Sequence, residues 1–322
     1  MVIDSGRDER ELLARIAHRW YLDDRTQTEI ANEFGLSRPK VQRLLVRARQ
    51  TGVVQIHIEA PVDVDLDLEV RLIAASGLAD AIVSRSAADP ETQRAAVARA
   101  AAGYLERQLL DRTVVAVSHG RDIGAIPRHY RPAAPIDGVF ASAMGGSPTI
   151  DLPTNPNEIC RALAERSGGR AESLFAPAYV ESAEVRDSLH AQEAVSHVLR
   201  MAAAADLALV GIGGTDDSCT MVRSGSLDIA EIGRLREEGA VGDVLGNYVD
   251  IDGELIASPH SSRLIGLSVD DLRRIPHVVA VVSGAEKPRA TLGVLRAGIV
   301  DVLIVDEANA RTVLDLAKGG DA

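Results

Sequence analysis

Lys287 is one of only three lysines in a chain that contains 32 arginines. A lysine ammonium is a compact point charge, whereas a guanidinium is a planar fork, so a position that keeps lysine suits a single phosphate or carbonyl oxygen. Lys287 follows the apolar run Val278–Val282 and the pair Ser283-Gly284. This position predicts a ligand contact. A solvated loop lysine is the alternative.

Three further apolar runs end in glycine, as the run before Lys287 does. Glycine lets a ligand approach backbone N–H groups, and the N-terminus of a following helix favours an anion. Open parallel sheets bind ligands past the carboxyl ends of their strands. One such glycine could simply turn the chain, but four at one edge predict a pocket. The four strand ends are Ser118-His119-Gly120, Gly145-Gly146, Gly213-Gly214 and Ser283-Gly284.

A second kind of chemistry is indicated by a basic segment near the N-terminus. Residues 34–50 hold five basic residues and no acid, although the net charge of the chain is −12. Residues 1–60 carry ten Lys/Arg and nine Asp/Glu, whereas residues 61–322 carry 25 and 38. An acidic body repels DNA, so the basic segment is the face suited to phosphates. A solvated basic helix face is the alternative, and we assign Arg49 to it.

Three helices are predicted to position these basic residues. Apolar residues recur at the 3.6-residue helical period over residues 10–21. Thr26 can cap a second helix, Gln27–Phe34, and Ser37 can cap a third that runs to about Gln50. The second and third helices are separated by only a few residues, so they must cross closely.

The spacing of small and apolar residues in these two helices is typical of a helix-turn-helix. Ala31 allows close crossing, Gly35 tolerates a positive φ in the turn, and Val41 and Leu44 can bury against the second helix. The third helix would enter the major groove, where arginine binds guanine and glutamine binds adenine. We therefore predict double-stranded operator DNA as a partner. The predicted DNA contacts are Thr26, Gln27, Ser37, Arg38, Lys40, Gln42, Arg43 and Arg47.

The pattern predicts two domains, an all-α helix-turn-helix DNA-binding domain (1–60) and an effector-binding and oligomerisation domain (61–322). Residues 53–58 alternate like a strand, and Pro61 with the acidic residues 62–69 would form the exit from the first domain. Apolar strands that alternate with helices predict an α/β Rossmann-like domain with a parallel sheet. Predicted strands lie at 81–83, 113–118, 139–144, 173–180, 207–212, 244–249, 278–282 and 302–305, and predicted helices at 91–110, 157–167, 195–205, 228–238 and 308–316.

Composition excludes several classes of protein. Cys160 and Cys219 form no CxxC pair and no histidine stands at metal-ligand spacing, which argues against a disulfide framework and a structural zinc site. No apolar run is long enough to span a bilayer, and the N-terminus lacks the apolar stretch of a signal peptide. We expect a cytoplasmic protein that contacts no membrane and uses no metal.

Residues 12–58 resemble the SorC family of bacterial sugar-responsive regulators, which are DeoR-like regulators with a sugar-binding domain. The pieces TQTEIA, LSRPKVQRLL and ARQTGVVQI are specific to that family. In the larger domain, VAVSHGRDI resembles the family's phosphate loop. It is followed in family order by PNEICRALAERSGG, LVGIGG, GAVGDVLGNYVDIDG and SGAEKPRATLGVLRAGIVDVLIVDE. The resemblance covers nearly the whole chain.

The resemblance implies a C-terminal fold similar to sugar-phosphate isomerases and glucosamine-phosphate deaminases, used as a sensor. It also implies a homo-oligomer, a dimer or a tetramer, on a partly palindromic operator. The implied effector is a phosphorylated sugar, or in some members a free sugar or polyol. No cofactor besides this carbohydrate is implied.

The family motifs also imply roles for single residues. Gly120 and Arg121 would contact an anionic group, Lys287 matches the family's GxxK, and Asp250 would bind hydroxyls unless it is a turn acid in YVDIDG. The predicted effector contacts are Ser118, His119, Gly120, Arg121, Asp122, Gly145, Gly146, Gly213, Asp250 and Lys287.

Two residues depart from the family's loop, which usually reads Ser-Trp-Gly-Arg-Thr. Asp122 replaces the threonine, and an ionised aspartate would repel a phosphate. Asp122 therefore favours a neutral sugar or polyol, whose hydroxyls a carboxylate can accept. His119 replaces the tryptophan and could donate to a ligand, although simple filling of the tryptophan's space is the alternative.

Two other functions remain open on the sequence. A sugar-phosphate isomerase or deaminase would need a general base beside the ligand, and Asp216, Asp217 and Glu286 are candidate carboxylates. A purely structural DNA-bridging protein would bind no ligand. Because the predicted DNA reader is fused to the sensor-like fold, we expect a regulator rather than an enzyme.

Overall fold

The computed structural model describes residues 5–54, 65–147 and 152–319. Contacts within the chain divide it into two compact units, Met1–Ala60 and Pro61–Ala322. Each unit has a hydrophobic core of its own, so each is described by itself.

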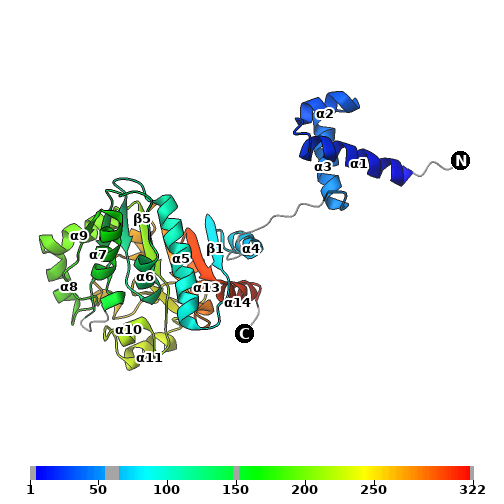
Figure 1. Ribbon diagram of the computed structural model, residues 1–322. Coiled ribbons are helices and arrows are strands. Elements are labelled where there is room, and N and C mark those ends of the chain that lie inside the picture. Colours follow the sequence, from blue (N-terminus) through cyan, green and yellow to red (C-terminus); the bar gives the residue numbers. More distant parts are fainter. Residues whose placement is uncertain (1–4, 55–64, 148–151, 320–322) are drawn as a thin grey trace. The chain divides into compact units, whose positions relative to one another are not determined.

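The described part of the first unit, residues 5–54, contains three helices, as the sequence predicts: α1 (Ser5–Tyr21), α2 (Gln27–Phe34) and α3 (Arg38–Gln50) (Figure 1). Thr26 caps α2 in a reciprocal capping box with Glu29. Ser37 stands at the N-cap position of α3 without a side-chain hydrogen bond, so the prediction that its hydroxyl caps α3 is wrong.

A tight corner joins α2 to α3. Gly35 ends α2 in the left-handed conformation, with φ 64°, which glycine adopts without strain. Ala31 is buried at this corner, and the N–H of Leu36 donates to its carbonyl oxygen. Val41 of α3 is fully buried in the shared core. The close crossing predicted from the spacing of these residues is confirmed.

The chain that leaves the first unit differs from the prediction. Val54 packs against the three-helix core, and its N–H donates to the carbonyl oxygen of Ala48. Most of the predicted strand, residues 55–58, lies outside the described residues, as do residues 61–64 of the predicted exit. The rest of that acidic stretch belongs to a helix, α4 (Leu66–Ser76), which Asp65 caps and whose Leu68 and Leu72 are buried.

A seven-stranded parallel sheet forms the centre of the second unit, as predicted. Its order is β1-β10-β9-β5-β2-β3-β4. β3 and then β4 are added to the sheet on one side of β2, whereas β9 and then β10 are added on the opposite side of β5. The order therefore reverses between β2 and β5, and this reversal marks the expected ligand crevice. The strands are β1 (Asp80–Ser84), β2 (Val114–Val117), β3 (Val139–Ser142), β4 (Arg170–Glu172), β5 (Leu207–Gly211), β9 (Val278–Val282) and β10 (Val302–Asp306).

Helices cover both faces of this sheet. Alternate strand residues point to opposite faces: Val115 and Val279 join one apolar cluster, whereas Ala116 and Ala280 join the other. The first face is covered by α5 (Pro90–Gln108), α6 (Arg121–Ala125), η1 (Ile126–Arg128) and α7 (Pro156–Ser167). The second is covered by α4, α9 (Glu193–Ala203), α11 (Ile229–Glu237), α12 (Val269–Leu272), α13 (Pro288–Arg296) and α14 (Glu307–Ala317).

A small antiparallel sheet corrects one predicted strand. The residues expected as a single strand at 244–249 form a hairpin, in which β7 (Gly242–Val244) pairs with β8 (Asn247–Val249). Leu245 and Gly246, both with positive φ, make the two-residue turn. β7 also pairs with β6 (Gly213–Gly214), which follows β5. The hairpin is thereby attached to the strand end at the point of reversal.

Other differences from the prediction concern short elements. No strand forms at 173–180, where one was expected; β4 ends directly before this segment, at Glu172. Four short helices were also not predicted: α6, α8 (Ala183–His190), α10 (Thr220–Arg223) and α12. The nine-residue helix α13, which Lys287 precedes, was also missed. Two short 3-10 segments complete the description, η2 (Leu152–Thr154) and η3 (Ser261–Arg263).

Candidate functional site

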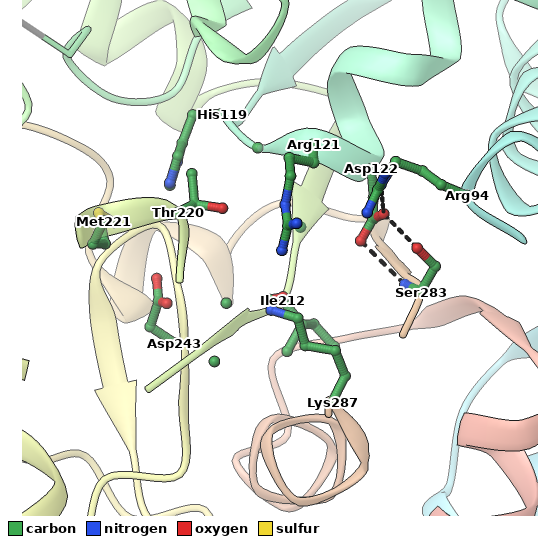
Figure 2. Close-up of a pocket in the computed structure, with 14 residues that line it drawn as sticks. Arg94, His119, Arg121, Asp122, Ile212, Thr220, Met221, Asp243, Ser283 and Lys287 are labelled. Atoms are coloured by element: carbon green, nitrogen blue, oxygen red, sulfur yellow. Dashed lines mark hydrogen bonds and ion pairs between the residues drawn. The ribbon is translucent and has the colours of Figure 1, made fainter. Parts of the chain in front are cut away.

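A pocket opens at the carboxyl ends of β2, β5 and β9, where the strand order reverses. We call it the switch-point pocket (Figure 2). Three of the four predicted strand-end loops contribute to it, together with the β7 hairpin and α10. Its lining residues are Arg94, His119, Gly120, Arg121, Asp122, Gly211, Ile212, Gly213, Gly214, Thr220, Met221, Asp243, Ser283 and Lys287.

Lys287 lies at the base of this pocket, directly before α13. Only 5% of its surface is exposed, and its Nζ donates to the carbonyl oxygen of Ile212 at 3.2 Å. An ammonium has three N–H donors, so two remain for a ligand. The interpretation of Lys287 as a solvated loop lysine is therefore wrong, because the side chain is buried and its charge interacts with the carboxylates of Asp243 and Asp216.

Asp243 reaches the pocket from β7 and faces Lys287 (Figure 2). It is 3% exposed, and its Oδ2 accepts the N–H of Gly246 at 2.8 Å. Burial raises the pKa of this carboxyl to about 6, although the Gly246 N–H and the Lys287 charge both act to lower it. A carboxyl with this pKa changes protonation near neutral pH, and either form can bind a ligand hydroxyl.

His119 follows β2 and points into the pocket towards Thr220 (Figure 2). Burial, assisted by the charge of Lys287, lowers the pKa of His119 to about 4, so the ring is neutral at pH 7. Its Nδ1 is buried without a hydrogen-bond partner among the described residues. A neutral imidazole offers one donor and one acceptor, and both suit a hydroxyl group.

The prediction for Asp122 has to be revised. The carboxylate accepts from Arg94 Nε at 3.2 Å, from the Ser283 N–H at 3.1 Å and from the Ser283 hydroxyl at 2.6 Å. These bonds tie the loop after β2 to the loop after β9, and the Arg94 guanidinium offsets the negative charge. The argument that Asp122 repels a phosphate thus loses its premise, and the Asp122 carboxylate, which lines the pocket, holds the two loops together.

Arg121 extends from the start of α6 into the pocket, and no ion pair links it to a described residue (Figure 2). Gly120 precedes it with φ 124°, a conformation that other residues rarely adopt. The Gly120 N–H already donates to the carbonyl oxygen of Thr154, so it is not free for an anion. Gly120 therefore shapes the loop, and the Arg121 guanidinium brings a positive charge to the pocket lining.

Four predicted contacts lie elsewhere. Ser118 is buried, and its hydroxyl accepts the Gly211 N–H, which joins β2 to β5 behind the pocket. Gly145 and Gly146 bond to the segments at Ile265 and Ala176, and a Cβ on Gly145 would lie 2.3 Å from a backbone oxygen.

Asp250 is the fourth of these predicted contacts. It accepts the N–H groups of Asp252 and Glu254, so it is the turn acid that was the alternative interpretation.

Gly213, in contrast, lines the pocket as predicted and determines where Asp243 sits. The two residues are paired across β6 and β7, and a Cβ added to Gly213 would lie 1.9 Å from Asp243 Oδ1. Sequence reasoning missed Asp243 itself, along with Arg94, Thr220 and Met221. The signal that could have found Asp243 is the motif GAVGDVLGNY, where an acid precedes a hairpin turn.

The three-helix unit presents a separate candidate surface. Arg38, Lys40, Gln42 and Arg43 are exposed on α3, so the basic residues do not turn inward. Arg47 is exposed but forms an ion pair with Glu9 at 3.1 Å. Of the other predicted DNA contacts, Thr26 uses its hydroxyl in the cap, Gln27 is half-buried and Ser37 is exposed.

Within the described residues, no group of His, Cys, Asp and Glu side chains could hold a metal ion. Over the same residues, no helix is both long enough and apolar enough to cross a membrane.

The parallel sheet and its switch-point pocket define a small-molecule-binding domain of the doubly wound α/β class. The family described as "Putative sugar-binding domain" matches residues 60–315, and the chain belongs to this family.

Full-length relatives are transcriptional regulators. The chain is 30% identical to the erythritol catabolism regulatory protein EryD of Brucella abortus, over 96% of this chain and 98% of that protein. It is 32% identical to the transcriptional regulator LsrR of Klebsiella pneumoniae, over 96% and 94%. The crystal structure of the full-length sorbitol operon regulator SorC from Klebsiella pneumoniae matches with a TM-score of 0.73 and 25% identity, over 95% of this chain and 99% of that one. These similarities identify a sugar-responsive regulator of the SorC type.

Proposed function

We propose that this protein binds operator DNA through α2 and α3 and that a carbohydrate in the switch-point pocket controls this binding. The observation that carries the proposal is the convergence of Lys287, Asp243, His119 and Arg121 on one pocket at the strand-order reversal. The exposed basic face of α3 supports the DNA-binding half, because arginine and glutamine read guanine and adenine in the major groove.

The effector is proposed to be a carbohydrate with an anionic group. Neutral His119, Asp243 and the two free Lys287 donors suit hydroxyl groups, because each can donate to or accept from them. Arg121 lacks an ion-pair partner among the described residues and would meet the anionic group. Since Asp122 is neutralised by Arg94, the sequence-based preference for a neutral polyol no longer has support.

Calorimetric titration tests this choice of ligand. The names of two relatives refer to erythritol and sorbitol, so the panel contains these polyols and their phosphates. We expect a phosphorylated member to bind, and Arg121→Gln to weaken it by at least about tenfold, as for a lost charge-assisted hydrogen bond. Arg200→Gln, an exposed arginine of α9 outside the pocket, is the control. Tighter binding of the free polyol would contradict the anionic effector.

Operator control is tested by gel shift. A duplex selected from a randomised library should bind the protein, and the ligand found by calorimetry should change the affinity. We also propose a homo-oligomer on a palindromic site, because the two halves of such a site are bound by two copies of the DNA-binding unit. Light scattering with and without the duplex measures the oligomeric state.

A catalytic function is the second candidate, favoured by Asp243. A carboxyl with a pKa of about 6 beside an ammonium has the properties of a general base. Of the carboxylates suggested by the sequence, Asp217 is paired with Arg236, and neither Asp216 nor Glu286 lines the pocket. Turnover of the bound sugar phosphate that Asp243→Asn abolishes would establish an enzyme, whereas unchanged ligand after prolonged incubation would support a sensor.

A further inference from the structure

Val46 is an apolar residue on the outward face of α3. It is 37% exposed and lies outside the core that Val41, Leu45 and Ala48 form on the inward side of the same helix. A β-branched residue in the middle of an exposed helix loses side-chain freedom, and Val46 does not pack against the apolar core of the unit in return. Its presence there is therefore not explained by the stability of α3.

The surroundings of Val46 are the side chains predicted to read bases. It follows Gln42 by four residues and Arg43 by three, and it precedes Gln50 by four, so all of them share one helix face. Pro39, Gln42, Arg43, Val46, Arg47, Gln50 and Thr51 line a shallow groove along this face. Single exposed aliphatic residues are common on proteins, but this one stands between hydrogen-bonding groups on the proposed recognition surface.

We propose that Val46 recognises the C5-methyl group of a thymine in the operator. Thymine is the base that presents a methyl group in the major groove, and it is read there by apolar contact. Contact with Val46 would remove both apolar surfaces from water and discriminate thymine from cytosine at one base pair. The inference rests on the proposed function, since it requires α3 to lie in the major groove.

The test uses the full-length chain and a duplex selected by it from a randomised library. Each thymine is replaced in turn by deoxyuridine, which lacks only the methyl group. We expect one position, with its symmetry mate in a palindromic duplex, to lose about fourfold in affinity for the wild type, as for one buried methyl group. Val46→Ala should bind the thymine and deoxyuridine duplexes equally. The matched control is Val70→Ala, an exposed valine of α4 that is 65% exposed, and it should keep the wild-type preference.

The outcomes separate the two ideas. Because Val46 is exposed, its replacement by alanine should leave the thermal midpoint unchanged or slightly higher. If Arg43→Ala weakens binding to the selected duplex while no deoxyuridine position distinguishes wild type from Val46→Ala, the methyl contact is refuted and DNA reading by α3 stands. If Arg43→Ala and Lys40→Ala both bind like the wild type, DNA reading by α3 fails and the Val46 inference with it.

Discussion

Two titratable side chains in the switch-point pocket have pKa shifts with opposite consequences for stability. Asp243 has a raised pKa of about 6 and His119 a lowered pKa of about 4, both chiefly because of burial. Below about pH 6, Asp243 binds a proton more readily in the folded state than in the unfolded chain. His119 shows the opposite behaviour, because its imidazole is protonated in the unfolded chain but stays neutral in the folded state. The two effects oppose each other between about pH 4 and 6.5, so they partly cancel in the wild type, and each is measured as the difference between the wild type and a variant at that residue.

Replacement of Asp243 by asparagine should stabilise the ligand-free protein at neutral pH. The raised pKa means that the folded state pays an ionisation penalty above about pH 6, and this penalty vanishes as the pH falls below the ordinary value near 4. We expect Asp243→Asn to raise the free energy of unfolding by about 1–3 kcal/mol at pH 7.5, with most of this gain lost at pH 4. Calorimetric unfolding at both pH values measures it. A loss of stability at pH 7.5 would show that the charged carboxylate is held by contacts that outweigh its burial.

Replacement of His119 by glutamine should protect the protein against acid. A lowered folded pKa contributes stability that is present above the ordinary value of 6.5 and lost as the pH falls towards 4. Relative to wild type, His119→Gln should gain about 2 kcal/mol between pH 7 and pH 5. The measurement is urea unfolding of both proteins at the two pH values. If the free energy of unfolding changed equally with pH in the two proteins, the pKa of His119 would not be lowered in the folded state.

At the scale of elements, the pairing of β6 with β7 delivers Asp243 to the pocket. Gly213→Ala places a Cβ 1.9 Å from Asp243 Oδ1 in the present geometry, so the pair must separate or the carboxylate must turn away. We expect a loss of about 1–3 kcal/mol in stability together with a loss of ligand affinity in calorimetry. The control is Gly103→Ala on α5, where a Cβ meets only the end of the Arg107 side chain at 3.6 Å.

That control has its own expected sign. Because alanine is the better helix former, Gly103→Ala should raise stability by about 0.5–1 kcal/mol and leave ligand binding unchanged. Equal ligand affinities for Gly213→Ala and wild type would show that the β6–β7 pair does not position the effector contacts.

The elements that the sequence predicted are those set by local signals. Thr26 starts α2 through a capping box, and Gly35 ends it in the left-handed conformation. Both signals lie within a few residues of the helix. The buried strands, such as Val278–Val282, are continuous apolar runs. Asp243 and Asp250 stand seven residues apart in one motif, and only the pairing of β7 with the distant Gly213 decides which one reaches the pocket. This pairing depends on tertiary contacts, which is why the wrong aspartate was chosen.

At the scale of the whole molecule, the charge is divided unequally between the two units. The second unit carries 25 Lys/Arg against 38 Asp/Glu, and the first carries ten against nine. A strongly acidic unit is repelled by DNA at distances within the Debye length. If DNA binds at α3 as we propose, binding is confined to the exposed basic side chains of this helix, and few phosphates are neutralised. Base contacts would then contribute a large share of the affinity for the operator.

The salt dependence of operator binding should reflect this small number of phosphate contacts. Lys40→Ala removes an exposed ammonium from α3, so we expect it to weaken binding to all duplexes alike. The slope of the logarithm of the binding constant against the logarithm of the salt concentration should fall by about 1 for each copy of α3 bound to the duplex. Arg43→Ala should instead cost about 1–3 kcal/mol on the selected duplex and little on random DNA, because a base contact carries sequence information. Fluorescence anisotropy across a salt series separates the two. A uniform loss for Arg43→Ala would assign this arginine to a phosphate, and the reading of bases would then depend on Gln42 and Arg38.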